Sequence, residues 1–287
     1  MAQIIDGKGL AASIREGIKA EAAILPRRPG LAVILAGEDP ASQLYVRNKV
    51  KDCEECGFYS RRYDLADGTP EEVLLGILNK LNADSSIDGI LVQLPLPDQM
   101  DEKRIIEAIS PEKDVDAFHP LNVGRMVRGD SPVWPCTPAG ISEMLEAYRI
   151  PVDGKICVMV GRSNIVGKPM GLRLLRDHGT VIYCHKHTPD LAAMTRQADI
   201  LIVAAGCKGL IRGGMVKEGA AVIDVAMNRD PETGKFSGDV VFDEVEPKAS
   251  FITPVPGGVG PMTRAMLMKN TLTLAKRHMG LLTEHQD

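Results

Sequence analysis

Tyr45 and Lys49 are residues whose types and spacing suggest chemistry. They stand four positions apart in the segment Gln43 to Gly57, which reads as a helix, so both project from one face, about 5–6 Å apart at Cβ. An aromatic ring beside an amine could hold a flat heterocycle and exchange protons with it. The alternative is a surface helix with a half-buried tyrosine and a solvated lysine.

Gln93 favours the chemical interpretation. It closes the apolar run from Ile87 and is followed by Pro95 and Pro97, which prevent ordinary continuation of a strand. Strand ends of this kind are where open α/β sheets bind ligands. A glutamine there could hydrogen-bond Lys49 and orient it. We therefore expect the helix and the strand end to contribute to one site.

A second kind of chemistry is indicated where the strand-like run Lys155 to Val160 turns into a segment with helical spacing. Small residues in that turn, Gly161 and Gly167, let a backbone approach a pyrophosphate, which the positive end of the following helix attracts. The match to the dinucleotide fingerprint is imperfect, because Ser163 replaces the second glycine and Gly167 comes one residue late. An ordinary tight turn is the alternative.

Three further short apolar runs predict strands of a parallel, doubly wound sheet: Thr180–Cys184, 199–206 and 220–226. The first of them leads into His185-Lys186-His187, which offers no carboxylate for the ribose hydroxyls of NAD. A cation there favours a 2′-phosphate, and therefore NADP over NAD. The alternative is a basic loop that is merely solvated.

The first half of the chain also has an α/β pattern. Helical spacing covers residues 10–24, residues 31–36 form a buried strand candidate, and the helix that carries Lys49 has Ser42 as a candidate cap and Gly57 as a stop. At 287 residues, two domains are expected.

Two loops complete the set of candidates. Residues 111–120 contain Asp114 and Asp116, which by themselves indicate only a capped, charged loop. Residues 253–263 combine three glycines with three prolines and lead into a helix from Arg264 to Arg277. We favour ligand contact over a flexible linker for this second loop.

Composition narrows the class of protein. With 34 basic against 38 acidic residues and no long run of like charge, nucleic-acid binding is not indicated. Neither an export signal nor a bilayer-spanning stretch is recognisable, so we expect a soluble cytoplasmic protein without membrane contact. Of six scattered cysteines only Cys53 and Cys56 form a Cys-x-x-Cys pair, and no second pair accompanies it. We therefore expect free thiols and no metal site.

Together these segments closely resemble the bifunctional methylenetetrahydrofolate dehydrogenase/methenyltetrahydrofolate cyclohydrolase (FolD) family over nearly the whole chain. The matching motifs are Gly37–Ser42 with Tyr45–Lys49, Val92–Pro97, Lys113–Asp116, Pro135–Pro138, the Gly161 turn and Pro254–Thr263. Several motifs in one order are far more specific than any one alone.

The resemblance implies two reactions. The first is oxidation of 5,10-methylenetetrahydrofolate by NADP to 5,10-methenyltetrahydrofolate, and the second is hydrolysis to 10-formyltetrahydrofolate. It also implies an N-terminal α/β substrate domain of residues 1–120 plus 265–287, in which the C-terminal helix returns to the first domain. A Rossmann-like domain of residues 138–264 would bind the cofactor, and the family usually forms a homodimer through this domain.

The resemblance also assigns roles. Lys49 becomes the central catalytic residue of ring opening, Gln93 its hydrogen-bonding partner, Tyr45 a ring stacked on the folate, and Asp116 the carboxylate that binds the pterin. The implied substrate-binding residues are Tyr45, Val92, Gln93, Leu94, Asp116, Pro256, Gly257, Gly258, Val259 and Gly260. The implied cofactor-binding residues are Gly161, Arg162, Ser163, Ile165, Lys186 and Met227.

Three departures from the family pattern concern these sites. Ala117 stands where glycine is usual, which matters if the position needs positive φ. Lys186 replaces a frequent serine, and Ala226-Met227 replaces Gly-Ile, so both bear on cofactor preference. Alternative functions are a monofunctional dehydrogenase, an oxidoreductase of shikimate-dehydrogenase-like architecture, and a non-enzymatic NADP-binding module.

Overall fold

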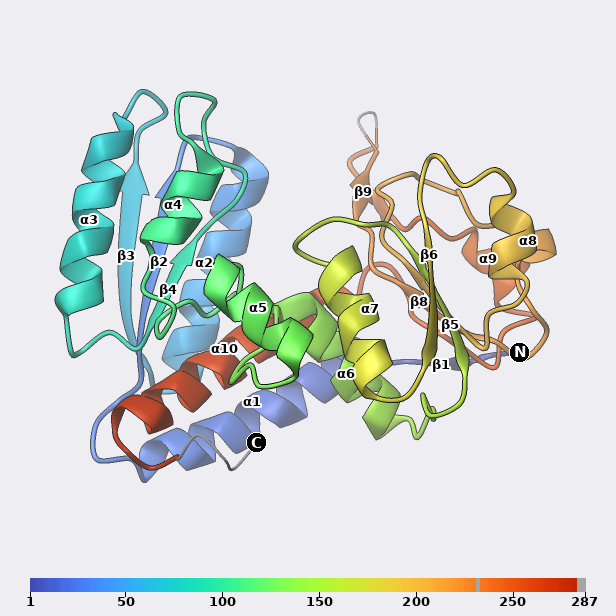
Figure 1. Cartoon of the computed structure of the whole chain (residues 1–287), viewed down its shortest axis with the longest axis horizontal. Helices are drawn as coiled ribbons and strands as arrows, with labels where there is room; N and C mark the ends of the chain where they lie inside the picture. Colours follow the sequence, from blue (N-terminus) through green and yellow to red (C-terminus); the bar gives the residue numbers. More distant parts are fainter. Residues whose placement is uncertain (231–232, 283–287) are drawn as a thin grey trace. The chain divides into compact units, whose positions relative to one another are not determined.

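The computed structural model describes residues 1–230 and 233–282, which form two compact α/β units (Figure 1). The six-stranded unit comprises Met1–Ala11 and Thr137–Thr263. The three-stranded unit comprises Ala12–Cys136 and the described residues from Arg264 on. The chain passes from one unit to the other within helix α1 (Gly7–Ala23) and within helix α10 (Val259–His278).

The three-stranded unit is a parallel sheet with β2 (Gly30–Ala36) between β3 (Tyr59–Leu65) and β4 (Gly89–Val92). Helices lie on both sides of it, so every residue of β2 and β4 is buried and the two strands read as continuous apolar runs (Figure 1). The helices that belong wholly to this unit are α2 (Pro40–Glu55), α3 (Glu71–Ala83), α4 (Glu102–Ala108) and α5 (Pro120–Arg128).

The predicted return of the C-terminal helix to the first domain is confirmed. In Figure 1, α1 and α10 run side by side below the three-stranded sheet, and an ion pair between Glu21 and Lys276 joins them. Asp88, just before β4, accepts hydrogen bonds from Arg27 and Gly30 N and lies 2.9 Å from His278 Nδ1. Burial alone would raise the pKa of Asp88, but these partners lower it. The last turn of α10 is therefore held against the edge of the sheet.

The six-stranded unit is the predicted doubly wound parallel sheet. Its order is β1 (Gln3–Ile4), β11 (Phe251–Ile252), β8 (Ala221–Asp224), β7 (Ile200–Val203), β5 (Ile156–Val160) and β6 (Thr180–Cys184), with all pairs parallel. Helices α6 (Cys136–Ala147) and α7 (Gly167–Arg176) cover one face, and α8 (Leu191–Thr195) and α9 (Phe242–Val245) the other (Figure 1). A short 3-10 helix spans Gly213–Met215, and β9 (Asn228–Arg229) pairs antiparallel with β10 (Phe236–Ser237).

The strand order reverses at β5. The chain leaves β5 toward β6 and then returns past β5 to β7. In open parallel sheets, this reversal leaves a crevice outside the carboxyl ends of the strands. The Gly161 turn follows β5 directly and therefore lies at the switch point.

Several local expectations differ from the structure. Residues 1–11 group with the six-stranded unit because β1 pairs with β11, with Gln3 opposite Phe251. Helix α2 begins at Pro40 rather than Gln43, and its cap is Asp39 rather than Ser42, since the Asp39 side chain accepts from Ser42 N at 2.7 Å. Strand β3 was not predicted, because its sequence is largely polar and it forms the sheet edge.

The C-terminal helix also starts earlier than expected. It begins at Val259 instead of Arg264, so the second half of the Gly/Pro-rich segment is helical. Within its first turns, the Thr263 hydroxyl donates to Val259 O at 3.3 Å.

Candidate functional site

Lys49 and Gln93 meet in the three-stranded unit. The Lys49 ammonium donates to Gln93 Oε1 at 2.9 Å, joining the middle of α2 to the residue that follows β4. The Gln93 amide donates from Nε2 to Leu94 O at 2.6 Å, and Gln93 N donates to Ile34 O of β2. Because its NH₂ group is engaged with Leu94, the amide presents its oxygen to Lys49.

Tyr45 lies one helical turn before Lys49 on α2. Its side chain is 38% exposed, and burial of the other part raises the pKa of the phenol. A ring that is half accessible, one turn from an ammonium, has the arrangement expected of a stacking platform.

Asp116 is held by residues from distant segments. Cys136 Sγ lies 3.3 Å from Asp116 Oδ1 and 3.7 Å from Val115 O. Asn270, from α10, donates to Val115 O and Trp134 O, each at 2.8 Å. Burial raises the pKa of the Cys136 thiol well above its usual value, and the adjacent Asp116 carboxylate raises it further. The thiol is therefore a hydrogen-bond donor to Asp116 rather than a thiolate.

The backbone after Asp116 takes the conformation that the family's usual glycine would suit. Ala117 has φ of +56° and is fully buried. The alanine occupies the left-handed region without displacing Asp116 from Cys136.

Three of the predicted substrate-binding residues line one small pocket of the three-stranded unit. Val92, Leu94 and Asp116 surround it together with apolar side chains that include Ile90 and Phe118. The end of β4 and the Asp116 loop therefore share one wall.

The other charged residues of the Lys113–Asp116 motif support the fold. Lys113 donates from Nζ to Leu81 O and Asp84 O, and burial lowers its pKa. Asp114 accepts from His119 N at 2.8 Å and from Asn122 Nδ2 at 3.0 Å, while its burial raises its pKa. Within this motif only Asp116 is available to a ligand.

The Gly161 turn is as tight as the sequence predicts. Gly161 has φ of +128°, and a Cβ there would lie 2.3 Å from Ala204 O. A Cβ on Gly167 would lie 2.5 Å from Gly161 O. Both positions require glycine, and the bare backbone they leave at the N-terminus of α7 fits the approach of a pyrophosphate.

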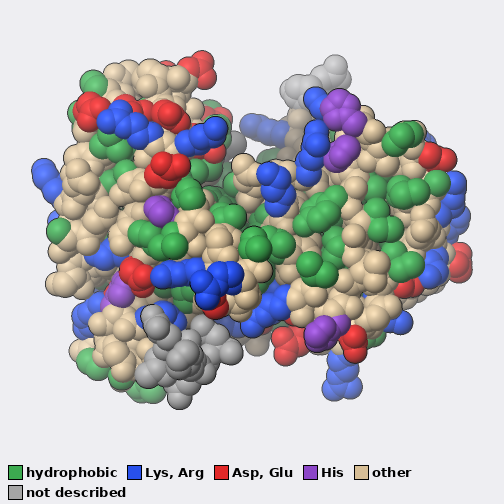
Figure 2. Space-filling view, viewed as in Figure 1, with side chains coloured by type: hydrophobic (Ala, Val, Ile, Leu, Met, Phe, Trp, Pro, Cys, Tyr) green, Lys and Arg blue, Asp and Glu red, His purple; other side chains and the backbone are tan. Residues whose placement is uncertain are grey.

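The remaining predicted cofactor residues lie near the carboxyl ends of the same sheet. Arg162, Ser163 and Ile165 are exposed in the turn, and the Ser163 hydroxyl accepts from Val166 N and Gly167 N at the start of α7. Lys186 is exposed in the loop after β6. Figure 2 shows histidine and basic side chains together at this end of the six-stranded unit.

Met227 and the Gly/Pro-rich segment meet at this edge of the six-stranded unit. Met227 Sδ is 3.6 Å from the place a Cβ on Gly260 would take. The peptide bond before Pro256 is cis, and Gly257 has φ of +109°. Gly257 O accepts from Lys8 N, so the start of α1 supports the turn. Gly258 is equally restricted, because a Cβ would lie 2.6 Å from Pro254 O.

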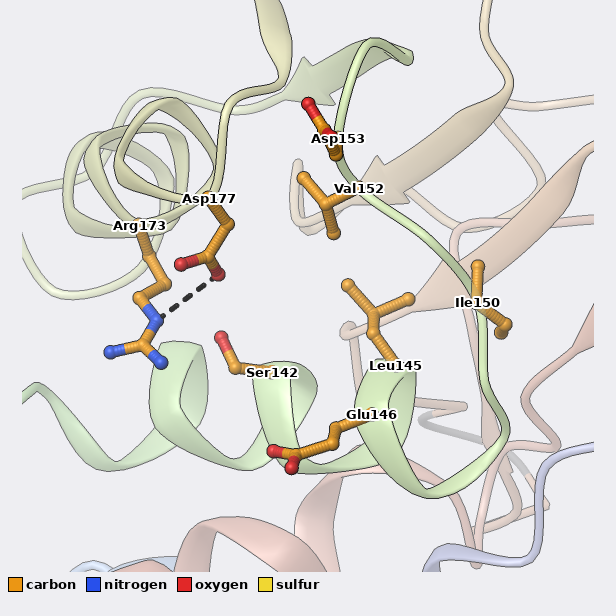
Figure 3. Close-up of a pocket in the computed structure, with 8 residues that line it drawn as sticks. All are labelled: Ser142, Leu145, Glu146, Ile150, Val152, Asp153, Arg173 and Asp177. Atoms are coloured by element: carbon orange, nitrogen blue, oxygen red, sulfur yellow. Dashed lines mark ion pairs between the residues drawn. The ribbon is translucent and has the colours of Figure 1, made fainter.

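A pocket of about 300 Å³ elsewhere in the six-stranded unit is not part of this edge (Figure 3). Side chains from α6, α7 and the segment before β5 line it, among them Ser142, Arg173 and Asp177. Arg173 Nε lies 3.4 Å from Asp177 in the last turn of α7. The pocket therefore lies toward the amino end of β5, away from the Gly161 turn.

Cys53 and Cys56 do not resemble metal ligands. Cys53 is buried within α2, and Cys56 is buried directly after its last residue. Desolvation raises the pKa of the Cys53 thiol to about 12. Among residues 1–230 and 233–282 we found no cluster of three or more His, Cys, Asp or Glu side chains suited to a metal ion. Within the same ranges, no helix has the length and apolarity needed to cross a bilayer.

Sequence reasoning gave no role to several residues that build the two sites. Asn270 and Cys136 hold the Asp116 loop, and Asp224 and Asp239 hold loops of the six-stranded unit. A signal existed for two of them: Asp224 closes an apolar strand as Gln93 does, and Asn270 interrupts an apolar helix face.

Comparison with known proteins assigns the chain to a family. Residues 5–116 match the model of the tetrahydrofolate dehydrogenase/cyclohydrolase catalytic domain, and residues 135–279 match that of the NAD(P)-binding domain of the same proteins. The bifunctional protein FolD of Moorella thermoacetica is 56% identical over 96% of this chain and 99% of its own length. The chain belongs to the tetrahydrofolate dehydrogenase/cyclohydrolase family. It is accordingly a bifunctional enzyme that combines a dehydrogenase with a cyclohydrolase.

Solved structures of this family agree over nearly the whole chain. FolD from Campylobacter jejuni has a TM-score of 0.94 at 51% identity, covering 96% of this chain and 99% of that one. The enzyme from Trypanosoma brucei, described in complex with NADP and an inhibitor, has a TM-score of 0.94 at 40% identity, covering 97% and 98%. Shikimate 5-dehydrogenase from Thermus thermophilus shares the fold alone, at 16% identity and a TM-score of 0.53 over 86% of this chain and 99% of that one. The shikimate-dehydrogenase-like alternative is therefore not favoured.

Proposed function

We propose that this enzyme oxidises 5,10-methylenetetrahydrofolate with NADP and hydrolyses the resulting 5,10-methenyltetrahydrofolate to 10-formyltetrahydrofolate, with Lys49 as the proton-transferring residue. The observation that carries the proposal is the 2.9 Å hydrogen bond between Lys49 Nζ and Gln93 Oε1. It joins a helix residue to a strand-end residue 44 positions away and orients the amine.

Ring opening needs a group that moves a proton. Water adds to the cationic methenyl carbon and loses one proton. One C–N bond of the adduct then breaks as the leaving ring nitrogen takes up a proton, and the hydroxyl of the adduct releases its proton to solvent as the formyl C=O bond forms. Lys49 in its amine form can accept the proton of the added water and return it to that nitrogen. Gln93 holds Nζ in one orientation through these two transfers.

Tyr45 and Asp116 would bind the pterin. The half-exposed ring of Tyr45 offers a face on which a flat heterocycle can stack. Asp116 offers a carboxylate that accepts from ring N–H groups, and the Cys136 thiol restricts its orientation. The predicted contacts of Val92, Leu94 and Pro256 to Gly260 belong to the same proposal.

NADP, when bound, would supply the hydride acceptor for the oxidation of the methylene carbon. We assign its phosphates to the backbone of Gly161, Arg162 and Ser163, since both glycines of the turn leave no room for a side chain. Ile165 and Met227 would contact it through apolar atoms, and Lys186 would pair with the 2′-phosphate. The NADP complex of the Trypanosoma brucei relative supports NADP over NAD.

Replacement of Lys49 by methionine tests the proposal. We expect Lys49→Met to lower cyclohydrolase kcat by about 100-fold or more, because proton transfer by a positioned side chain contributes roughly that factor. Lys51→Met is the matched control. Lys51 lies on the same helix, its side chain is 70% exposed, and its Nζ forms an ion pair with Glu55 at 3.7 Å. A folded Lys49→Met enzyme that keeps its cyclohydrolase rate would contradict the role of Lys49.

We also propose that two copies associate through the six-stranded unit. Leu175 on α7 is 62% exposed and Tyr183 on the edge strand β6 is 40% exposed, which places large apolar side chains beside an open sheet edge. Light scattering should give the mass of a dimer, and Leu175→Glu should shift it toward the monomer. A wild-type monomer at micromolar concentration would contradict the arrangement.

A further inference from the structure

Asp239, in the six-stranded unit, is a fully buried carboxylate with several hydrogen-bond donors around it. Its Oδ2 accepts from Ala205 N at 2.7 Å and from Gly206 N at 2.9 Å. Its Oδ1 accepts from Cys207 N at 2.7 Å and from Asn228 Nδ2 at 2.9 Å. Three successive backbone N–H groups of the loop after β7 thus converge on one side chain.

A second buried carboxylate holds Asp239 in place. Asp224, the last residue of β8, accepts from Asp239 N at 3.1 Å and from Val240 N at 2.8 Å. It also accepts from Ala226 N at 3.2 Å. A Cβ on Gly238 would lie 1.8 Å from Asp224 Oδ2, so this contact requires glycine. The hydrogen bonds of Asp224 and Asp239 therefore link the end of β8 to the loop after β7.

The segments held by the hydrogen bonds of Asp224 and Asp239 border the proposed cofactor residues. Ala204 begins the loop and packs directly on the Gly161 turn, where a Cβ would lie 2.3 Å from Ala204 O. Met227 stands between Ala226, bound to Asp224, and Asn228, bound to Asp239. All these segments follow carboxyl ends of parallel strands, which share one edge of the sheet.

The loop itself faces outward. Ala205, Gly206 and Cys207 are exposed, while the carboxylate that binds their N–H groups is not. The loop therefore turns its N–H groups toward Asp239 and leaves its other groups exposed.

We propose that Asp239 is a positioning residue for the dinucleotide: it fixes the loop of residues 204–207 against the Gly161 turn and holds Met227 beside it. The inference rests on the proposed function of this edge as the NADP site. Asp239 acts only on cofactor binding, and so on the dehydrogenase. The cyclohydrolase depends on Lys49 in the three-stranded unit and does not need the loop.

Replacement by asparagine is the most specific test. Asp239→Asn keeps the volume, but it leaves one oxygen to accept and places an NH₂ group against backbone N–H donors. We expect the Kd for NADP, measured by titration calorimetry, and the KM for NADP to rise about tenfold or more, since each charged hydrogen bond lost is worth about that factor. Cyclohydrolase kcat/KM should stay within about twofold of wild type.

Asp199→Asn is the matched control. Asp199 also accepts from a backbone donor, Ile156 N at 2.9 Å, and pairs with Lys217, but at the amino ends of β5 and β7. Its replacement should cost stability while the Kd for NADP stays within about twofold of wild type.

The outcomes separate positioning from mere support of the fold. An unchanged Kd for NADP in folded Asp239→Asn, or an equal loss of both activities, would overturn the proposal. If Asp239→Asn does not fold, Asn228→Ala decides, because it removes one of the four donors; we expect a severalfold rise in Kd, and no rise would overturn the proposal. Wild-type protein that binds NADP without oxidising methylenetetrahydrofolate would refute the proposed function, and the Kd comparison would still decide the role of Asp239.

Discussion

At the scale of single residues, the orientation of one amide decides how Lys49 is presented. The Gln93 amide donates from Nε2 to Leu94 O and accepts from Lys49 at Oε1. A flip of the amide that exchanges its nitrogen and oxygen would therefore lose these hydrogen bonds. Two prolines turn the chain away directly after this residue.

Removing the amide should impair hydrolysis while leaving the fold intact. We expect Gln93→Met, which keeps the length of the side chain, to lower cyclohydrolase kcat by about tenfold to a hundredfold, because Nζ loses its acceptor. Steady-state rates with methenyltetrahydrofolate would measure this. Gln43→Met serves as the control. Gln43 lies on α2, the helix that carries Lys49, and its side chain makes a long contact of 3.5 Å with Glu38 O. Equal rates in both variants would show that Gln93 does not orient Lys49.

Asp224 introduces a pH dependence of stability. Burial raises the pKa of its carboxyl to about 6, and the nearby Asp239 also raises it, although the hydrogen bonds from Val240 N, Asp239 N and Ala226 N oppose them. The folded state therefore binds the proton more tightly than the unfolded chain, so stability is lost as the pH rises from about 4 to about 6.

Comparison with Asp224→Asn isolates this effect. The free energy of unfolding of the wild type should fall relative to that of the variant by on the order of 2 kcal/mol between pH 4 and pH 6. Urea unfolding at a series of pH values would measure it. If the free energy of unfolding of the wild type instead rose relative to that of Asp224→Asn between pH 4 and pH 6, the folded protein would hold Asp224 ionised.

At the scale of elements, several helices end in the same motif with different residues. At the end of α2, Gly57 N bonds to Glu54 O and Phe58 N to Cys53 O, with Gly57 at φ of +75°. These are the bonds of a Schellman motif. Helix α6 ends in the same way with Arg149 at φ of +55°, and α7 with His178 at +66°. A side chain in this region costs about 1–2 kcal/mol.

Arg149→Gly should therefore stabilise the enzyme. Arg149 is exposed, so its replacement removes the strained Cβ without opening a cavity. After subtraction of the larger entropy of unfolded glycine, we expect a gain of about 0.5–1 kcal/mol in the free energy of unfolding. Gly57→Ala should show the converse, a loss of about 1 kcal/mol. Chemical denaturation of both variants would measure these changes, and a loss in Arg149→Gly would mean that its side chain makes a stabilising contact.

At the scale of the whole molecule, the residues proposed for hydrolysis and those proposed for cofactor binding lie in two units, each with a core of its own. One core joins the strands of the six-stranded sheet to α8 and α9, and the other joins β2 and β4 to α3 and α4. Lys49 and Asp116 lie in the three-stranded unit, and Gly161 and Lys186 lie in the six-stranded unit. Loss of cofactor binding and loss of hydrolysis should therefore be separable by mutation.

Thermal unfolding should report the cofactor preference. A ligand at 100 times its Kd stabilises the folded state by about 2.7 kcal/mol. NADP should therefore raise Tm by several degrees, and NAD at the same concentration should raise it less. In Lys186→Ala the two shifts should become similar, because the cation that favours the 2′-phosphate is gone. A larger shift with NAD in the wild type would reverse the assignment of NADP.

What the sequence determined by itself is local. The glycine turn after β5, the apolar strands, the pairing of Tyr45 with Lys49 on one helix face and the end of β4 at Gln93 depend on residues within a few positions of one another. Their backbone preferences and periodicity are readable without the fold. The partnership of Lys49 with Gln93 was expected because strand ends of open α/β sheets bind ligands, and the family motifs imply it as well.

What only the tertiary structure decided involves residues far apart in the chain. Asn270 reaches Val115 across 155 positions, Asp239 reaches Ala205 across 34, and β1 joins β11 from opposite ends of the chain. No sequence pattern marks such partners, because a buried polar side chain is satisfied by whichever group the fold brings to it. The residues proposed to do the chemistry were therefore recognisable from the sequence, while those that hold them in place became visible only in the folded structure.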